Sequence, residues 1–178
     1  MSASDSRTAT LKLLQAFRKL PFQAVPLAQP LQEEHLIRGL LQRPDNQIQS
    51  LRLYRYQDDR NGSLTKVVVQ LGSRIEGHVK LVHGGFLALL IDDVLGYGVE
   101  TLASRTSQNQ WHHAVTANLQ IDFRQVVPAD EGHALVFYIR PTETAHRKSG
   151  FQLWITNTEH DVLYCQATSL QVIPSSKL

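Results

Sequence analysis

The run Phe86 to Ile91 is apolar on every side of a helix and ends at two aspartates, Asp92 and Asp93. A helix of this kind packs inside a protein core, and we expect it to extend from about Gly85 to Leu102. An unpaired carboxylate in a core costs several kcal/mol, so each aspartate needs a partner, a cavity or a chemical role. We expect Asp93 to cap a loop or face solvent, and Asp92 to have the chemical role.

Strand-like segments surround this helix in the sequence. Two of them, 48–56 and 64–71, flank the turn-forming pair Asn61-Gly62 and predict a hairpin. The others follow the helix, separated by short turns that suit antiparallel neighbours, at 113–125, 132–140, 150–158 and 162–173. The prediction is an α+β fold in which an antiparallel sheet of five to six strands wraps around one long central helix.

Strict alternation in the segment 113–125 assigns its side chains to two faces. One face carries Ala117, Leu119, Ile121 and Phe123, and the other carries polar residues that begin with Thr116.

Two helices are predicted before the sheet. Residues 8–20 repeat leucine and phenylalanine at helical spacing as far as Pro21, and a second helix begins at Pro30 with acidic residues in its first turn. The chain therefore divides into an N-terminal helical extension (1–45), a main domain (46–173) and a C-terminal tail (174–178).

The composition favours one globular domain. The chain has 178 residues, 42% of them hydrophobic, and a formal charge of only +2, which does not predict nucleic-acid binding. No apolar run approaches the roughly 18 residues of a membrane helix, so we expect no membrane span. The single cysteine, Cys165, excludes a disulfide framework, and we expect it to pack in the core of an intracellular protein.

The start of the central helix can bind a negatively charged oxygen. Gly84 and Gly85 allow close approach of the backbone, and the first N–H groups of a helix are free donors aided by its dipole. His-Gly-Gly alone is equally typical of a tight loop with a packed histidine. Asp92 lies two turns beyond Gly85, about 10 Å along the helix, so one carbonyl cannot touch both. A site that uses both groups is expected to join two subunits.

Three segments together resemble one family: His83 to Asp92, Thr116 to Arg124, and Val127-Pro128, in this order and at the family's spacing. Over residues 46–173 the chain resembles the hotdog-fold acyl-CoA thioesterases, and within them the phenylacetyl-CoA and THEM4-like branch. The resemblance implies the hotdog fold, an acyl-CoA substrate, no cofactor, and a homodimer or dimer of dimers with its site at the subunit interface.

The resemblance also implies roles for single residues. Asp92 matches the nucleophile or general base, the N–H of Gly85 matches the group that polarises the thioester carbonyl, and Thr116 matches a residue that assists or positions water.

His83 and Gly84 match loop-shaping positions. Some relatives carry an asparagine six residues before the histidine, where this chain has Gly77, and His78 beside it is our candidate for the missing contact.

Four cations are candidates for binding the phosphates of coenzyme A. The resemblance assigns this role to the turn His146-Arg147-Lys148 and to Arg124, although an ordinary solvated turn would have the same composition. Neighbouring His112 and His113 would point to opposite faces of a strand, so we expect no metal site.

The predicted function is hydrolysis of acyl-CoA to a free acid and coenzyme A. A hydratase or dehydratase of the same fold is an alternative, but it works with an aspartate and a histidine on one helix, and no histidine lies between Gly84 and Leu102. A non-catalytic acyl-CoA-binding module is the other alternative.

The last three residues, Ser176-Lys177-Leu178, spell a peroxisomal address and predict binding to the import receptor. An N-terminal stretch rich in basic residues also resembles a mitochondrial transit peptide, so mitochondrion and cytoplasm are alternative locations.

Overall fold

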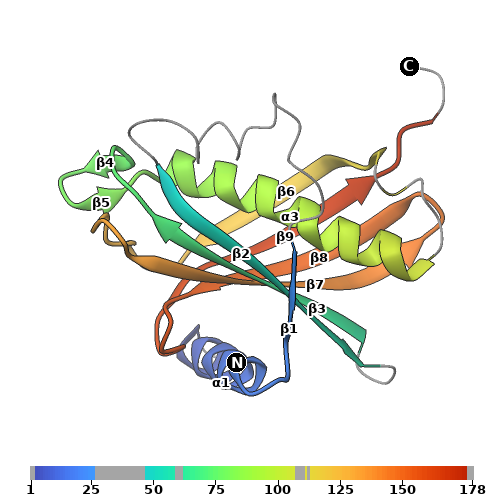
Figure 1. Ribbon diagram of the computed structural model, residues 1–178, viewed down its shortest axis with the longest axis horizontal. Helices are drawn as coiled ribbons and strands as arrows, with labels where there is room; N and C mark the ends of the chain where they lie inside the picture. Colours follow the sequence, from blue (N-terminus) through green and yellow to red (C-terminus); the bar gives the residue numbers. More distant parts are fainter. Residues whose placement is uncertain (1–2, 27–46, 59–61, 107–110, 112, 176–178) are drawn as a thin grey trace.

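The computed structural model describes residues 3–26, 47–58, 62–106, 111 and 113–175 (Figure 1). A seven-stranded antiparallel sheet with the order β1-β2-β3-β7-β8-β9-β6 carries the long helix α3 (Gly84–Thr106) on one face and α1 (Ala3–Arg18) on the other. Its strands are β1 (Gln23–Val25), β2 (Ile48–Asp58), β3 (Gly62–Leu71), β6 (Val115–Phe123), β7 (Ala134–Ala145), β8 (Lys148–Thr156) and β9 (Leu163–Val172). A small separate hairpin, β4 (Glu76–His78) with β5 (Leu81–Val82), precedes α3.

The predicted α+β architecture is confirmed, with one strand more than expected. The segment between Pro21 and Pro26 forms β1, which pairs with β2 so that Gln23 lies opposite Arg55. The helix predicted to begin at Pro30 falls in 27–46, outside the described residues, and the proposed domain boundaries stay a prediction.

Helix α3 packs on the inner face of the sheet and is buried on most of its sides. Leu90, Ile91 and Leu95 are fully buried, and a Cβ added at Gly98 would lie 2.7 Å from Cγ2 of Ile139, so the helix lies close to β7. Burial of this helix on most sides agrees with the expectation, and the exception is a narrow strip that contains Asp92 and Gly96. Asp92 is exposed in this strip, within hydrogen-bond distance of the edge strand β6.

The outer face of the sheet is covered by α1. Leu14 and Phe17 are buried against a second apolar cluster that includes Tyr138 and Trp154, and the ring of Phe17 lies 5.4 Å from that of Tyr138. The predicted amphipathic helix thus forms, and its apolar side shields strands β7 and β8 from water.

A bulge in β6 changes which side chains face the helix. Thr116 lies opposite Gln171 and Asn118 opposite Leu170, so Ala117 is an extra residue in the strand. Strict alternation placed Thr116 on the face opposite to Leu119. That prediction is wrong, because the extra residue returns Thr116 to the inner face, beside α3.

A buried histidine holds the turn beneath α1. His160 is 3% exposed, with Nδ1 2.8 Å from the carbonyl oxygen of Thr158 and Nε2 2.7 Å from the hydroxyl of Tyr138. Since a carbonyl only accepts, Nδ1 carries the proton and Nε2 accepts from Tyr138. Burial lowers the pKa of His160, with a smaller contribution from Lys66 and Arg18.

This histidine makes stability depend on pH. The lowered pKa means that the unfolded chain binds the proton more readily, so the contribution of His160 is complete above about pH 6.5 and is lost as the pH falls below it. We expect the Tm to drop from pH 7.5 to pH 5 more steeply in the wild type than in His160→Asn, where asparagine tolerates the left-handed backbone (φ 64°) and does not titrate. Thermal unfolding across this pH range measures it. Equal slopes in the two proteins would exclude His160 as the titrating group.

Candidate active site

The loop before α3 is fixed by backbone hydrogen bonds on both sides. The N–H of Val82 donates to the carbonyl of Val127 (2.9 Å), and the N–H of His83 donates to the carbonyl of Ile75 (2.8 Å). These bonds tie the β4–β5 hairpin to the loop after β6. As a result, His83 and the two glycines enter the first turn of α3 in one defined direction.

Three consecutive N–H groups in the first turn of α3 donate to His83, in two different ways. Those of Phe86 and Leu87 donate to its backbone carbonyl at 3.0 and 3.1 Å, whereas that of Gly85 donates to its side-chain Nδ1 at 2.9 Å. The Gly85 N–H is therefore bonded to a group that a rotation of one side chain removes. His83 is exposed, so its ring can leave without moving the backbone.

Gly77 explains where the ring of His83 lies. A Cβ added at position 77 would come within 2.6 Å of Cδ2 of His83, so a larger residue there is incompatible with this ring position. Position 77 is where some relatives carry an asparagine. Glycine at this position leaves room for the ring of His83 beside the N–H of Gly85. His78 is exposed on β4.

Asp92 and Thr116 are brought together from α3 and β6. The hydroxyl of Thr116 donates to Oδ1 of Asp92 at 2.7 Å, a short bond of the charge-assisted kind. The bulge at Ala117 makes this contact possible, because it turns Thr116 toward the helix. Two residues that are 24 positions apart in the sequence therefore form one polar pair.

Gln171 on β9 adds a residue that the sequence reasoning missed. Its Nε2 donates to Oγ1 of Thr116 at 3.0 Å and to Oγ of Ser169 at 2.9 Å. Gln171 and Ser169 are both buried on the inner face, which Cys165 and Ala167 continue. The signal was present in the sequence, since every second residue of this strand faces the helix and the last two such positions within β9 are polar.

A polar cavity of about 290 Å³ opens beside this group. It is lined by Asp92, Asp93, Gly96, Val99, Glu100, Trp111, Ala114, Thr116 and Gln171. Asp93 is half-buried there. Burial raises the pKa of Tyr97, and the charges of Asp93 and Glu100 raise it further. Tyr97 is therefore a neutral phenol near neutral pH. The thiol of Cys165 is fully buried and burial raises its pKa to about 12, so it is not a nucleophile.

The four candidate phosphate ligands lie at opposite ends of β9. Arg124 donates its backbone N–H to the carbonyl of Tyr164 and pairs with Asp122 at 3.0 Å. The turn His146-Arg147-Lys148 lies at the other end, where Lys148 faces Val172 and Nε of Arg147 donates to the carbonyl of Ile173. A strand rises about 3.4 Å per residue, so one phosphate cannot touch both groups of the same chain.

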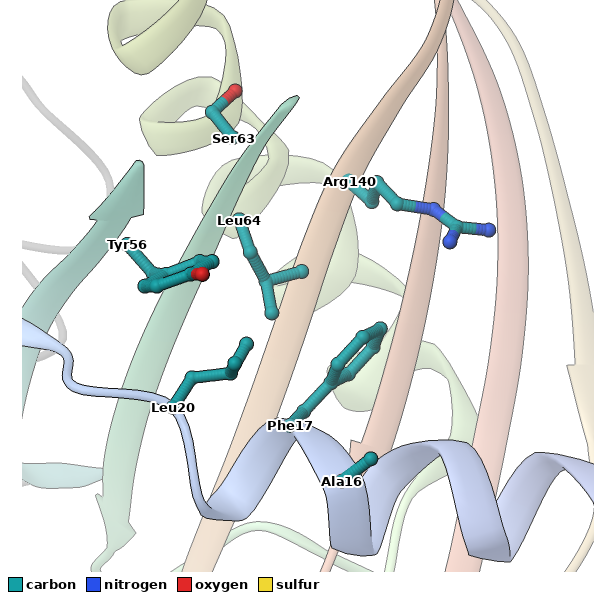
Figure 2. A pocket seen from close by; sticks show the side chains of 7 residues that line it. All are labelled: Ala16, Phe17, Leu20, Tyr56, Ser63, Leu64 and Arg140. Carbon is teal, nitrogen blue, oxygen red and sulfur yellow. The ribbon is translucent and has the colours of Figure 1, made fainter. Parts of the chain in front are cut away.

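A second cavity lies on the outer face of the sheet, away from Asp92. It measures about 320 Å³ and is lined by Ala16, Phe17, Leu20, Tyr56, Ser63, Leu64 and Arg140 (Figure 2). Its one charged side chain, Arg140, donates to Gln152 at 2.7 Å and lies over the ring of Trp154. These seven residues include no carboxylate, histidine or thiol.

Among the described residues, no three His, Cys, Asp or Glu side chains are grouped to hold a metal ion. Within the same ranges, no helix has the length and apolar character needed to cross a bilayer.

The architecture agrees with the comparisons. The family model of the thioesterase superfamily matches residues 80–164, which contain α3, the Asp92–Thr116 pair and the strands up to the start of β9. The chain has the hotdog fold, and over residues 80–164 it resembles the thioesterase superfamily. This confirms the resemblance found in the sequence, and the finer branch stays a prediction.

Several relatives of this hotdog protein are known. An uncharacterised protein of Schizosaccharomyces pombe is 27% identical over 123 residues, which are 67% of this chain and 66% of that protein, just under two thirds of its length. A hypothetical thioesterase of Streptococcus pneumoniae, solved with coenzyme A, has a TM-score of 0.56 at 16% identity and covers 72% of this chain and 89% of its own. Zebrafish thioesterase superfamily member 2 has a TM-score of 0.57 at 10% identity and covers 78% and 93%. At these identities the two structures show the fold.

Proposed function

We propose that this protein hydrolyses acyl-CoA thioesters, with Asp92 as the reacting carboxylate. The observation that carries the proposal is the pair of Asp92 and Thr116. A carboxylate on the exposed side of a core helix accepts a 2.7 Å hydrogen bond from a strand hydroxyl and lines a polar cavity large enough for water and a reacting carbonyl. The coenzyme A in the Streptococcus pneumoniae relative supports the substrate class.

The chemistry follows from these groups. The thioester oxygen displaces Nδ1 of His83 and accepts the Gly85 N–H, so that negative charge develops at the start of α3. Asp92 then either attacks the carbonyl carbon or takes a proton from a water that attacks it. If water attacks, the carbon–oxygen bond of the acid forms directly, the carbon–sulfur bond breaks, and the thiolate of coenzyme A gains the proton taken by Asp92. If Asp92 attacks, the carbon–sulfur bond breaks to give a mixed anhydride on Asp92 and a thiolate that gains a proton, and a water then hydrolyses the anhydride to release the acid and restore the carboxylate.

Each complete site contains two subunits in this proposal. Gly85 and Asp92 are separated by about 10 Å along α3, too far for one carbonyl to reach both. Strand β6 is an edge strand of the sheet, and Val115 and Phe123 on it are 52% and 53% exposed. Pairing of this edge with a second copy would cover these side chains and place the start of one α3 near Asp92 of the other.

The phosphates of coenzyme A are assigned to the cations near these groups. Gly84 lies 3.7 Å from Phe123, measured from an added Cβ to the ring, so Arg124 is at the Gly85 end of the site. The turn His146-Arg147-Lys148 is at the Asp92 end, since Lys148, Val172 and Val115 share one row across the sheet. In a dimer, a coenzyme A bound across the interface can contact one group from each subunit.

The first test is release of free thiol from a panel of acyl-CoAs. Asp92→Asn keeps the shape of the side chain but can neither attack nor accept a proton, so we expect kcat to fall by about 10²-fold or more. Asp130→Asn, at an exposed aspartate outside the site, is the matched control and is expected to keep full activity.

The outcomes of this test separate the candidate functions. Binding of acyl-CoA without thiol release at any chain length would show a binding module. Full activity in Asp92→Asn would move the catalytic role to another residue. Release of water from, or addition of water to, an acyl chain with the thioester intact would show a hydratase or dehydratase.

Mixing two inactive variants tests the shared site. Gly85→Pro removes the polarising N–H at a helix position that tolerates proline, and Asp92→Asn removes the base. In a mixed dimer, a shared site retains one intact pair of Gly85 and Asp92, so random mixing should recover about a quarter of wild-type activity. Recovery of no activity, with hybrid dimers shown by native mass spectrometry, would place each site within one subunit.

We further propose that the protein acts in the peroxisome, through Ser176-Lys177-Leu178. A fluorescent protein fused ahead of residue 1 should accumulate in peroxisomes and lose this location when the last three residues are deleted. Accumulation in mitochondria or cytosol with the tail intact would contradict the proposal.

A further inference from the structure

We infer that Gln171 is a positioning residue that directs the hydroxyl proton of Thr116 toward Asp92. The inference deepens the proposed function and rests on the roles given there to Asp92 and Thr116. The amide of Gln171 donates to Thr116 and Ser169, and it acts on Asp92 through Thr116.

The donor and acceptor roles in this chain of bonds are set by chemistry. A hydroxyl has one proton, and an ionised carboxylate only accepts, so Thr116 must use its proton for Oδ1 of Asp92. The lone pairs of Thr116 are then left to accept, and Nε2 of Gln171, at 3.0 Å, is a donor. The hydrogen bonds of all three groups are therefore satisfied only when Gln171 donates to Thr116 and Thr116 donates to Asp92.

The opposite orientation of the amide would compete with Asp92. If Oε1 of Gln171 faced Thr116 in place of Nε2, it would accept the same proton that Asp92 accepts. In the structure Oε1 lies 3.4 Å from Oγ1 of Thr116, beyond the nitrogen that makes the 3.0 Å bond. The orientation of one amide thus decides whether Thr116 serves the carboxylate.

Burial makes this arrangement rigid. Gln171 is 3% exposed and Ser169 is 6% exposed, and both face the inner side of a strand whose other inward residues include Cys165 and Ala167. A hydrogen bond in such surroundings is stronger than one in water, and an unused amide donor there is costly. The two protons of Nε2 are used by Thr116 and Ser169, so the amide has a single satisfied orientation.

The consequence for the reaction concerns the two oxygens of Asp92. Oδ1 accepts the proton of Thr116, which leaves Oδ2 as the oxygen that attacks carbon or takes the proton of water. Without Gln171, the hydroxyl of Thr116 is free to rotate, and the carboxylate loses its fixed orientation relative to the cavity.

Gln171→Met tests this role, because methionine keeps the length of the side chain but has no N–H. We expect kcat to fall about tenfold, the size of one lost hydrogen bond, with KM changed less than about twofold. In a Thr116→Ala background, the same substitution should change kcat by less than about twofold, since the group through which Gln171 acts is absent. Gln166→Met, the same change on the outer side of β9, should leave kcat unchanged.

Two outcomes would overturn the inference: an unchanged kcat in Gln171→Met, or an equal loss in the wild-type and Thr116→Ala backgrounds. If Gln171→Met does not fold, the isosteric Gln171→Glu takes its place in the same cycle.

A crystal structure of the variant gives a readout that does not depend on activity. We expect the Thr116 hydroxyl to leave Asp92 or to occupy two rotamers in the Gln171 variant, and to keep its contact in Gln166→Met. Failure of the wild type to hydrolyse any acyl-CoA would refute the proposed function alone. Retention of the wild-type Thr116 rotamer in the Gln171 variant would refute the positioning role alone.

Discussion

The packing of α3 on the inner face of the sheet is the constraint on which the other features depend. Apolar side chains on one side of the helix fill the concave sheet, with Gly98 allowing contact with Ile139. Because most of the helix surface is used for burial, only a narrow strip with Asp92 and Gly96 is left at the surface of the chain. Asp92 gains both a fixed position and access to water from this division, which a fully enclosed helix could not provide.

The N–H of Gly85 and the hydroxyl of Thr116 are each hydrogen-bonded by a side chain that is not itself proposed to react. His83 bonds the N–H of Gly85 from the loop, and Gln171 bonds the hydroxyl of Thr116 from β9. The first contact is exposed and must open for a carbonyl to bind, whereas the second is buried and holds its geometry. The exposed contact at Gly85 can open when the substrate carbonyl binds. The buried contact at Thr116 keeps Asp92 in the same orientation before and after the substrate binds.

The sequence was sufficient for the elements and for the residue types of the site. The length of the apolar run predicted α3, and alternation with turn residues predicted the six long strands, because both patterns record local burial. It was not sufficient for the face of Thr116, since a bulge depends on pairing with β9, which no local pattern contains. It also missed the bond between His83 and Gly85, which depends on the space left by Gly77, and Gln171, whose partner Thr116 is 55 residues away in the chain.

The extra residue in β6 decides which face of the sheet each side chain before it occupies. Residues before the bulge lie on the face opposite to the one that strict alternation from Leu119 would give them. Thr116 reaches the helix for this reason. Regular pairing of Ala117 with Gln171, without the bulge, would turn Thr116 outward while leaving every residue type of the site in the sequence. Homologous chains can therefore share the composition of the site and still differ in its geometry, according to whether this bulge forms.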